Sequence, residues 1–327
     1  MMKKNSRVAQ MLGIEYPVIQ AAMNWLTSAE LAAAVSNAGG CGLLGPNAGQ
    51  AVMTADIQET CDRMRDEVRK TRSLTDKPFG FQIINPVKGN DTPFVEGFMD
   101  IALTEPGVKL ILVNGYLSKE NLDKLHEKGI VVIRKMISDD IETFKETESL
   151  GFDAVVATGV DCGGHTNDKC KIGTLSIIQI AKEAVSIPVI AAGGMVNGKA
   201  VQAAGVLGAE GIYCGTRFVT SKEAPTAQNV KELMCKTTTD DLIEMNGIWG
   251  SIRSVKTPVA VKCHEMTEES HAKNKMEINK MYQPGYKVSM LEGDIEAAIV
   301  DCGAAIGQVK EILSCEEIMA EFAKGME

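Results

Sequence analysis

Eight short runs of apolar and β-branched residues recur along the first two thirds of the sequence, and each is followed by a segment with helical spacing of its apolar residues. Successive runs begin roughly 20 to 40 residues apart, which leaves room for a crossover helix between parallel strands. Apolar runs of this kind indicate strands that are covered on both faces, as in a parallel sheet. The runs are YPVIQ from Tyr16, CGLLG from Cys41, FGFQII from Phe79, VKLILVN from Val108, VVIRK from Val131, AVVATG from Ala154, PVIAAGG from Pro188 and GIYCGTRF from Gly211.

This number of strand–helix units, spread over about 220 residues, predicts an α/β fold of the (β/α)8 or TIM barrel type. An open, doubly wound sheet has the same alternation of strands and helices, and a strand count alone leaves that alternative open. We assign residues 1–236 to the barrel domain.

Residues 237–327 follow a different pattern. The stretch HEMTEESHAKNKMEINKMYQPGY is polar and helix-prone, whereas GDIEAAIVDCGAAIGQVKEI is apolar and rich in small residues. The two segments predict a C-terminal helical extension that packs near the barrel mouth, with its last helices returning to the barrel. The extension could cover the mouth or only stabilise the barrel, and the sequence leaves both interpretations open.

Composition and charge disfavour some of the molecules that the protein could bind. The formal net charge is −9, and the lysines and arginines are scattered, which disfavours nucleic acid or an anionic membrane as a partner. We find no apolar leader and no apolar run long enough for a membrane span, and the nine cysteines lack paired spacing. We therefore expect a cytoplasmic protein with reduced cysteines that acts on a small molecule, and a homodimer is compatible with the sequence.

Small residues follow the seventh and eighth apolar runs. Gly193 and Gly194 leave backbone N–H groups uncovered before the next helix, and Gly215 and Thr216 do the same on the neighbouring strand. In a barrel these positions lie side by side at the carboxyl ends of the strands, where backbone N–H groups bind phosphate. We interpret them as a phosphate site, and the alternative is that the glycines serve only tight turns.

Polar and charged side chains stand at the ends of other runs. Lys135 could neutralise an anionic ligand group, or it could form a Schiff base as in a phosphosugar lyase or isomerase. The neighbouring Arg134 suggests instead that charge is simply tolerated at this strand end. Asn24 and Gln82 suit hydrogen bonds to a heteroaromatic ring, and Met23 and Trp25 offer apolar contact, although ordinary loop packing is the preferred interpretation of any one of them taken singly.

The stretch GVDCGGHTNDKC follows the sixth run and precedes a helix that we expect to begin near Thr174. It forms a loop of about fifteen residues at the mouth, longer than a structural connection needs. Cys162 and Cys170 lack the spacing of a zinc site, so we expect no metal, and a cysteine nucleophile is a minor alternative. His165 is the one histidine placed at the mouth and suits proton transfer, unless it faces solvent from a loop.

Five motifs in order carry a family resemblance: YPVIQAAMNW, DKPFGFQI, GVDCGGH, IPVIAAGGMVNG and LGAEGIYCGTRF. Together they resemble the FMN-dependent nitronate monooxygenase (2-nitropropane dioxygenase) superfamily, which also contains enoyl-ACP reductases and NAD(P)H:quinone reductases. The resemblance covers about residues 7 to 225 and returns at GDIEAAIVDCGAAIGQV. It departs at Ala21-Ala22-Met23, where relatives usually have Gly-Gly-Met, and at Gln82, where asparagine is common.

The resemblance implies a flavoprotein oxidoreductase with FMN at the mouth of a TIM barrel. A nitronate or NAD(P)H would then supply electrons for an acceptor, and an enoyl-ACP reductase or quinone reductase is the alternative activity. A flavin-binding module without catalysis, or a lyase or isomerase that uses Lys135, is a more distant interpretation. The implied catalytic residue is His165, and the implied cofactor-binding residues are Ala22, Met23, Asn24, Gln82, Lys135, Asp161, Gly163, Gly164, Gly193, Gly194, Gly215 and Thr216.

Overall fold

The computed structural model describes residues 1–86, 88–89, 91–135, 140–166, 171–248, 250–297 and 299–327. Within these residues, eight parallel strands form the main sheet: β1 (Val18–Gln20), β2 (Gly42–Leu44), β3 (Phe79–Asn85), β4 (Val108–Gly115), β5 (Val131–Lys135), β6 (Ala154–Thr158), β8 (Val189–Ala192) and β9 (Gly211–Cys214). Their order is β1-β9-β8-β6-β5-β4-β3-β2, and a parallel bridge between Ile19 and Cys41 brings the two ends of the sheet together. The predicted barrel is therefore confirmed, and the open sheet is excluded.

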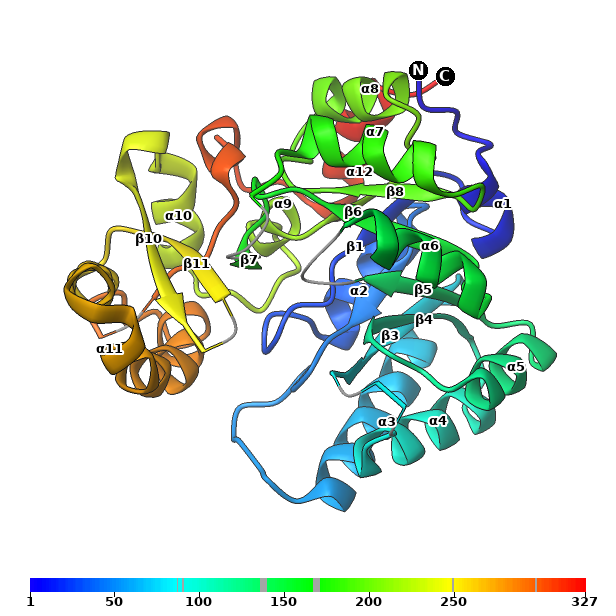
Figure 1. Cartoon of the computed structure of the whole chain (residues 1–327), viewed down its shortest axis with the longest axis horizontal. Coiled ribbons are helices and arrows are strands. Elements are labelled where there is room, and N and C mark those ends of the chain that lie inside the picture. Colours follow the sequence, from blue (N-terminus) through cyan, green and yellow to red (C-terminus); the bar gives the residue numbers. More distant parts are fainter. Residues whose placement is uncertain (87, 90, 136–139, 167–170, 249, 298) are drawn as a thin grey trace.

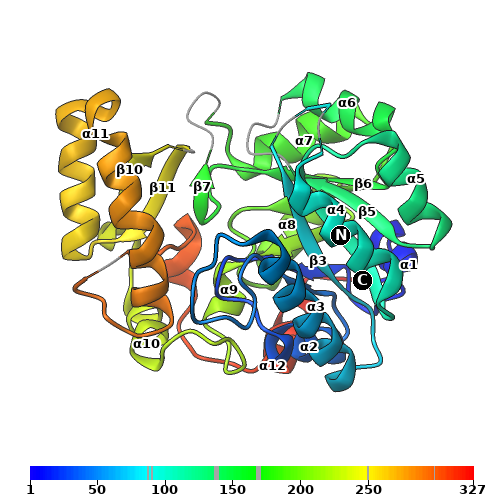
Figure 2. The same cartoon turned by 90° about the horizontal axis from the view of Figure 1, so that it is seen from below.

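Helices follow the strands and cover the outside of the barrel (Figures 1 and 2). Several begin at a side-chain cap, such as Asp140, whose carboxylate accepts a hydrogen bond of 2.7 Å from the N–H of Thr143. Within the described residues, no helix combines the length and the apolar character that a bilayer-crossing segment requires. The barrel helices are α1 (Arg7–Leu12), α2 (Ala29–Asn37), α3 (Ile57–Leu74), α4 (Pro93–Thr104), α5 (Lys119–Glu127), α6 (Ile141–Leu150), α7 (Thr174–Ala184), α8 (Gly198–Val206) and α9 (Thr216–Val219). The helix α10 (Gln228–Lys236) packs instead with the extension (Figure 1), where its Val230 and Met234 share a core with Met245.

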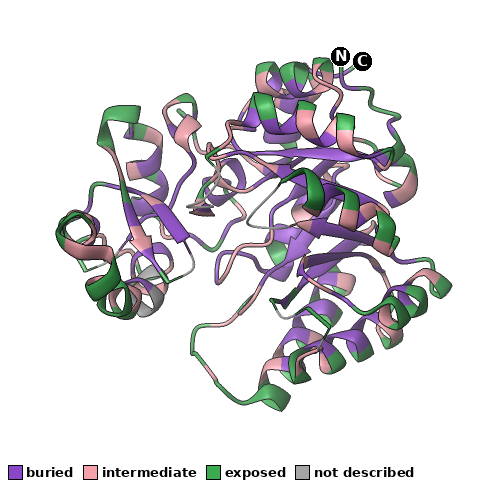
Figure 3. Cartoon of the chain, in the orientation of Figure 1, coloured by how far each residue is buried: buried purple, intermediate pink, exposed green. Residues whose placement is uncertain are grey.

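The interior of the barrel is a packed core. Side chains from several strands meet there, among them Leu112, Ile133, Val156 and Ile190, and all four are fully buried. Figure 3 shows the barrel strands buried and the outward faces of the helices exposed. Because side chains fill the barrel, a ligand can enter only at its rim, where the strands end and the loops begin.

The sequence predicted a helical C-terminal extension, but the extension in the structure is only partly helical. Besides the long helix α11 (Pro258–Met290), it contains the strands β10 (Leu242–Gly247) and β11 (Gly250–Val255) and the 3-10 helices η1 (Thr239–Asp241) and η2 (Ala304–Gln308). The short strand β7 (Gly164–Thr166), which comes from the loop after β6, pairs with β11 and completes a three-stranded antiparallel sheet. The extension is therefore tied to the barrel mouth by backbone hydrogen bonds.

The last helix, α12 (Cys315–Ala323), returns to the barrel and packs against α2, α8 and α9. Its Phe322 ring lies 6.1 Å from the ring of Phe218 in an edge-to-face arrangement. The two termini lie side by side, as Figure 1 shows, because Met2 and Met326 form a parallel bridge. Both termini therefore lie on the outside of the barrel, away from the extension (Figure 1).

Candidate active site

A cavity of about 290 Å³ lies at the carboxyl ends of the barrel strands. Its wall includes the last residues of four strands, Lys135 of β5, Thr158 of β6, Ala192 of β8 and Cys214 of β9. The structure brings every site residue predicted from the sequence to this one cavity: Ala22, Met23, Asn24, Gln82, Lys135, Asp161, Gly163, Gly164, His165, Gly193, Gly194, Gly215 and Thr216. Their individual roles remain predictions.

The two glycines after β8 expose their backbone to the cavity. Gly193 and Gly194 have φ angles of 98° and 71°, which side chains rarely adopt, and a Cβ atom on Gly193 would lie 2.7 Å from Thr174 Oγ1. In the described part of the chain, the N–H groups of Gly193 and Gly194 donate no hydrogen bond to another residue. Buried or partly buried N–H groups normally have acceptors, so these two are available to a ligand.

On the neighbouring strand, Gly215 and Thr216 lie at the start of α9 and face the same cavity. Thr216 Oγ1 accepts a hydrogen bond of 3.0 Å from the N–H of Gly303 in the extension. Gly163 approaches the same place so closely that a Cβ atom on it would lie 2.9 Å from Gly303 N. Three segments that are distant in sequence therefore meet at one corner of the cavity.

The loop after β6 is anchored at several points. Asp161 Oδ2 accepts hydrogen bonds from the N–H of Thr174 (2.8 Å) and its hydroxyl (2.6 Å), so this oxygen holds the start of α7. Arg253 of β11 donates hydrogen bonds of 2.9 Å to the carbonyl oxygens of Val160 and Cys162. The predicted loop is therefore held in place by hydrogen bonds at several residues, and it contains the strand β7. Cys170 lies outside the described residues.

His165 lies on the strand β7 and not in an unpaired loop. It lies on β7 opposite Ile252 of β11, and it lines the cavity. The other three histidines lie elsewhere: His126 next to Asp153, His264 at the carbonyl oxygen of Glu244, and His271 at that of Gly247. Of the four, His165 alone is in a position to contact a ligand in the cavity.

Two residues of the extension that the sequence analysis missed stand beside His165. The ring of Tyr282 on α11 lies 5.2 Å from the imidazole at an interplanar angle of 88°, and its hydroxyl donates a 2.9 Å hydrogen bond to Asp301 Oδ2. Both residues line the cavity and are 7% exposed. Burial raises the pKa of the Asp301 carboxyl to about 7, although the hydrogen bond from Tyr282 opposes the shift. A lone carboxylate in the apolar stretch AAIVDCGAA was the signal in the sequence.

Residues after β1 and within β3 form a further part of the cavity wall. The N–H of Ala22 donates a 3.0 Å hydrogen bond to the hydroxyl of Tyr213, which rises from inside the barrel. Asn24 Oδ1 accepts a 3.0 Å hydrogen bond from Asn47, and Gln82 is buried at the cavity. Trp25, for which the sequence left both ligand contact and ordinary packing open, packs in the core between the barrel and the extension.

Lys135 and Arg134 point to opposite sides of β5, because successive residues of a strand alternate. Lys135 ends the strand and lines the cavity. Arg134 is fully buried on the helix side, where it donates a 2.8 Å hydrogen bond to the carbonyl oxygen of Gly115. The charge of Arg134 is tolerated on β5 in a buried, hydrogen-bonded position, so it gives no reason to treat Lys135 as a solvated lysine.

The chemistry of the wall limits what the cavity can do. Among the described residues, no group of three histidine, cysteine or acidic side chains is placed to hold a metal ion. The cavity does offer one imidazole, one ammonium group, a buried carboxyl with its tyrosine, and a set of backbone N–H donors. This combination suits an anionic ligand with an aromatic ring more than it suits hydrolysis by a nucleophile.

Comparisons with known proteins cover nearly the whole chain. A family model described as nitronate monooxygenase matches residues 5–325. A probable nitronate monooxygenase of Staphylococcus aureus strain JH9 is 31% identical over 288 residues, which cover 77% of this chain and 78% of that protein. A probable nitronate monooxygenase of Staphylococcus saprophyticus is 30% identical over 307 residues, which cover 82% of this chain and 83% of that protein.

Solved structures show the same architecture. The structure of FabK from Thermotoga maritima matches with a TM-score of 0.84 at 30% identity, covering 98% of this chain and 96% of that one. A nitroalkane oxidase from Streptomyces ansochromogenes matches with a TM-score of 0.78 at 21% identity, covering 97% and 98% of the two chains. At that lower identity the likeness concerns the fold alone.

Proposed function

The chain belongs to the nitronate monooxygenase family, and we propose that it is an FMN-dependent oxidoreductase whose substrate is a nitronate. The observation that carries the proposal is the pair of unused N–H groups on Gly193 and Gly194, at the rim of a barrel cavity that also presents His165. When bound, FMN would supply the electron-transfer chemistry between donor and acceptor. The residues around the cofactor would bind it, orient the substrate and hold or release protons.

The residues present fit a phosphate-bearing cofactor. The glycines after β8 and β9 expose backbone N–H groups without side chains in the way, and a Cβ atom on Gly193 would crowd Thr174. Such a corner holds the terminal phosphate of a mononucleotide by several hydrogen bonds at once. Ala22, Met23, Gln82 and Lys135 lie on the remaining wall, where we place the aromatic ring of the cofactor.

Two side chains would act on charge and protons. Lys135 would balance negative charge on the cofactor or the substrate, because it stands at the end of β5 and lines the cavity. His165 would hydrogen-bond to the substrate and hold or release a proton, and the pairing of β7 with β11 fixes the backbone that carries it. The substrate would bind between the cofactor and the extension.

The identity of the electron donor distinguishes a nitronate monooxygenase from the reductases of the same superfamily. We expect the purified protein to be yellow and to lose its flavin absorbance when it is mixed anaerobically with a nitronate. Bleaching by NADH or NADPH, with no response to a nitronate, would favour a reductase that acts on a quinone or an enoyl substrate. A colourless protein that does not take up added FMN would contradict the proposal. Free FMN mixed with the same reductants is the control.

Location and partners are further parts of the proposal. The described cysteines Cys41, Cys61, Cys162, Cys214, Cys235, Cys263, Cys302 and Cys315 are free thiols, which supports a reducing compartment such as the cytoplasm. The size of the cavity supports a small-molecule substrate. Neither a nucleic acid nor a membrane surface is needed for the function that we propose, and a homodimer is compatible with it.

A further inference from the structure

Tyr282 and Asp301 form a buried polar pair in the cavity wall that the proposed chemistry does not yet use. They come from different parts of the extension, α11 and the segment before η2. Tyr282 donates its hydroxyl hydrogen to Asp301 Oδ2 at 2.9 Å, and its ring packs edge-to-face against His165. Among the described residues, Asp301 Oδ1 has no hydrogen-bond partner although it is buried. A buried carboxylate oxygen that accepts no hydrogen bond lowers the stability of a fold, so its presence beside His165 calls for a functional explanation.

The surroundings of Asp301 keep its charge uncompensated. Arg253 of β11 directs its guanidinium to Glu244 (2.6 Å) and to two backbone carbonyl oxygens, and within the described chain no cation pairs with Asp301. Cys302 stays a neutral thiol, because burial raises its pKa to about 12. Besides Asp301, the titratable residues that line the cavity are Tyr282, His165, Lys135, Asp161, Cys162, Tyr213 and Cys214, and the residues of η2 carry none. Burial is thus the main influence on the Asp301 carboxyl.

We propose that Tyr282 and Asp301 act as a hydrogen-bond switch toward an anionic or carbonyl oxygen of the substrate. When Asp301 is ionised, it accepts the hydroxyl hydrogen of Tyr282, as in the structure, and Tyr282 offers the substrate no donor. When Asp301 is protonated, its own O–H donates to the Tyr282 oxygen, so the tyrosine hydroxyl turns its hydrogen to the cavity. No bond to carbon forms or breaks, and no electron moves. Asp301 is a positioning residue, and Tyr282 is the group that contacts the substrate.

The switch rests on the proposed function, because it needs a substrate whose oxygen lies beside His165. A nitronate meets this requirement with its N–O oxygens, and a carbonyl compound meets it with one oxygen. The direction of the pH dependence follows from the burial of Asp301. Its carboxyl is protonated below pH about 7 and ionised above it, so the donor is available on the acid side and is withdrawn as the pH rises.

The test compares wild type, Asp301→Asn and Tyr282→Phe, each loaded with FMN, in a profile of kcat/KM against pH. We expect the wild-type value to fall about tenfold per pH unit above pH 7. Asp301→Asn should lack this alkaline limb, because a side-chain amide does not gain or lose a proton in this pH range. Tyr282→Phe should be about 100-fold slower than wild type at pH 6 and should also lack the limb. Asp123→Asn and Tyr16→Phe, which lie outside the cavity, are the matched controls and should keep the wild-type profile.

A second readout needs neither FMN nor turnover. In the protein without cofactor, the infrared band of a protonated carboxyl should disappear with a midpoint near pH 7, and Asp301→Asn should lack that band. An alkaline limb that persists in Asp301→Asn or in Tyr282→Phe overturns the switch, and so does a carboxyl band that is already lost at pH 5. If the wild type binds no FMN, the proposed function fails and the switch fails with it. If the wild type binds FMN and turns over while the limb persists in the variants, the switch alone fails.

Discussion

Replacing His165 with alanine is expected to lower kcat with a nitronate by about 100- to 10,000-fold while FMN remains bound. His165 faces the cavity from β7, whose backbone pairing with β11 does not depend on the imidazole, so the wall should keep its shape. The lost group is the one that we expect to hydrogen-bond to the substrate and to hold a proton there. Turnover under saturating nitronate, with the flavin spectrum recorded on the same sample, measures the effect.

The matched control for this variant is His126→Ala. His126 lies near Asp153 at a distance of 3.1 Å and does not line the cavity, so its loss should leave turnover close to that of wild type. If His165→Ala turns over as fast as wild type with its flavin bound, the proposed role of His165 is wrong.

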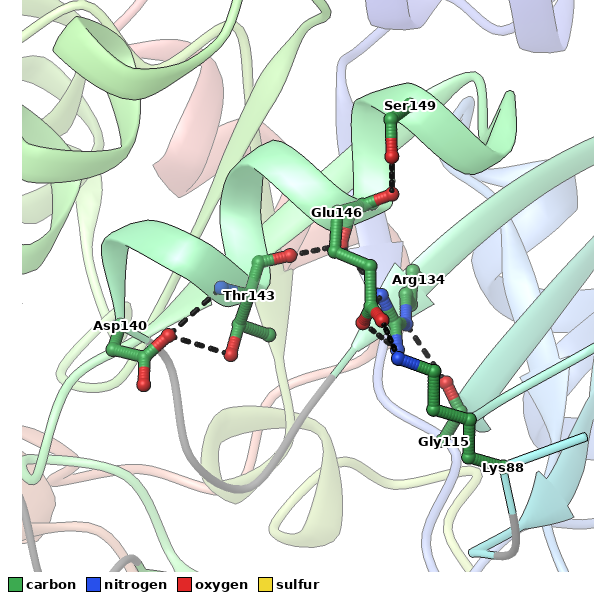
Figure 4. A network of polar contacts seen from close by, with 8 residues as sticks. Lys88, Gly115, Arg134, Asp140, Thr143, Glu146 and Ser149 are labelled. Atoms are coloured by element: carbon green, nitrogen blue, oxygen red, sulfur yellow. Dashed lines mark hydrogen bonds and ion pairs between the residues drawn. The ribbon is translucent and has the colours of Figure 1, made fainter.

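Replacing Arg134 with methionine is expected to lower the free energy of unfolding by about 3–5 kcal/mol. Arg134 is fully buried, and it donates hydrogen bonds to Gly115, Glu146 and Thr147, as Figure 4 shows in part. Its guanidinium also lies over the rings of Tyr116 and Phe152, at 4.7 Å and 5.6 Å from their centres. Methionine fills a similar volume but removes the donor to the Gly115 carbonyl and the Thr147 hydroxyl, and it leaves Glu146 with Lys88 as its remaining cation.

Urea denaturation followed by circular dichroism measures this loss, and Lys88→Met is the matched control. Lys88 is also an ion-pair partner of Glu146, but it reaches that carboxylate from solvent, so its removal should change stability little. The two cations together hold the pKa of Glu146 below its ordinary value, with Lys88 as the larger influence. An Arg134→Met protein as stable as wild type would show that the buried network contributes nothing to the fold.

The barrel could be predicted because its strands are covered on both faces. Such strands form apolar runs in the sequence, and the eight barrel strands lie within the runs identified there, except that β3 and β4 each extend one residue further. The cavity residues followed from the same reasoning, since the carboxyl ends of parallel strands meet at one rim. Gly193 and Lys135 could be placed there before any side-chain contact was known.

The extension could not be predicted in the same way. β7 has three residues and no alternation of apolar and polar side chains, and its partner β11 lies far away in sequence. The approach of Tyr282 to His165 likewise depends on how α11 crosses the small sheet, which no local pattern encodes. The burial of Arg134 likewise depends on helix α6, whose Glu146 accepts its hydrogen bonds, and no local sequence pattern encodes that contact.

The central claim is that the glycine corner after β8 and β9 holds the phosphate of a mononucleotide. The most direct measurement is a titration of the cofactor-free protein with FMN and with riboflavin, followed by flavin fluorescence. We predict that FMN binds at least about 100-fold more tightly than riboflavin, because several charge-assisted hydrogen bonds are lost without the phosphate. This preference should collapse in Gly193→Ala but persist in Gly129→Ala, whose backbone has a similar positive φ outside the cavity. Equal affinities for FMN and riboflavin in the wild-type protein would contradict the claim.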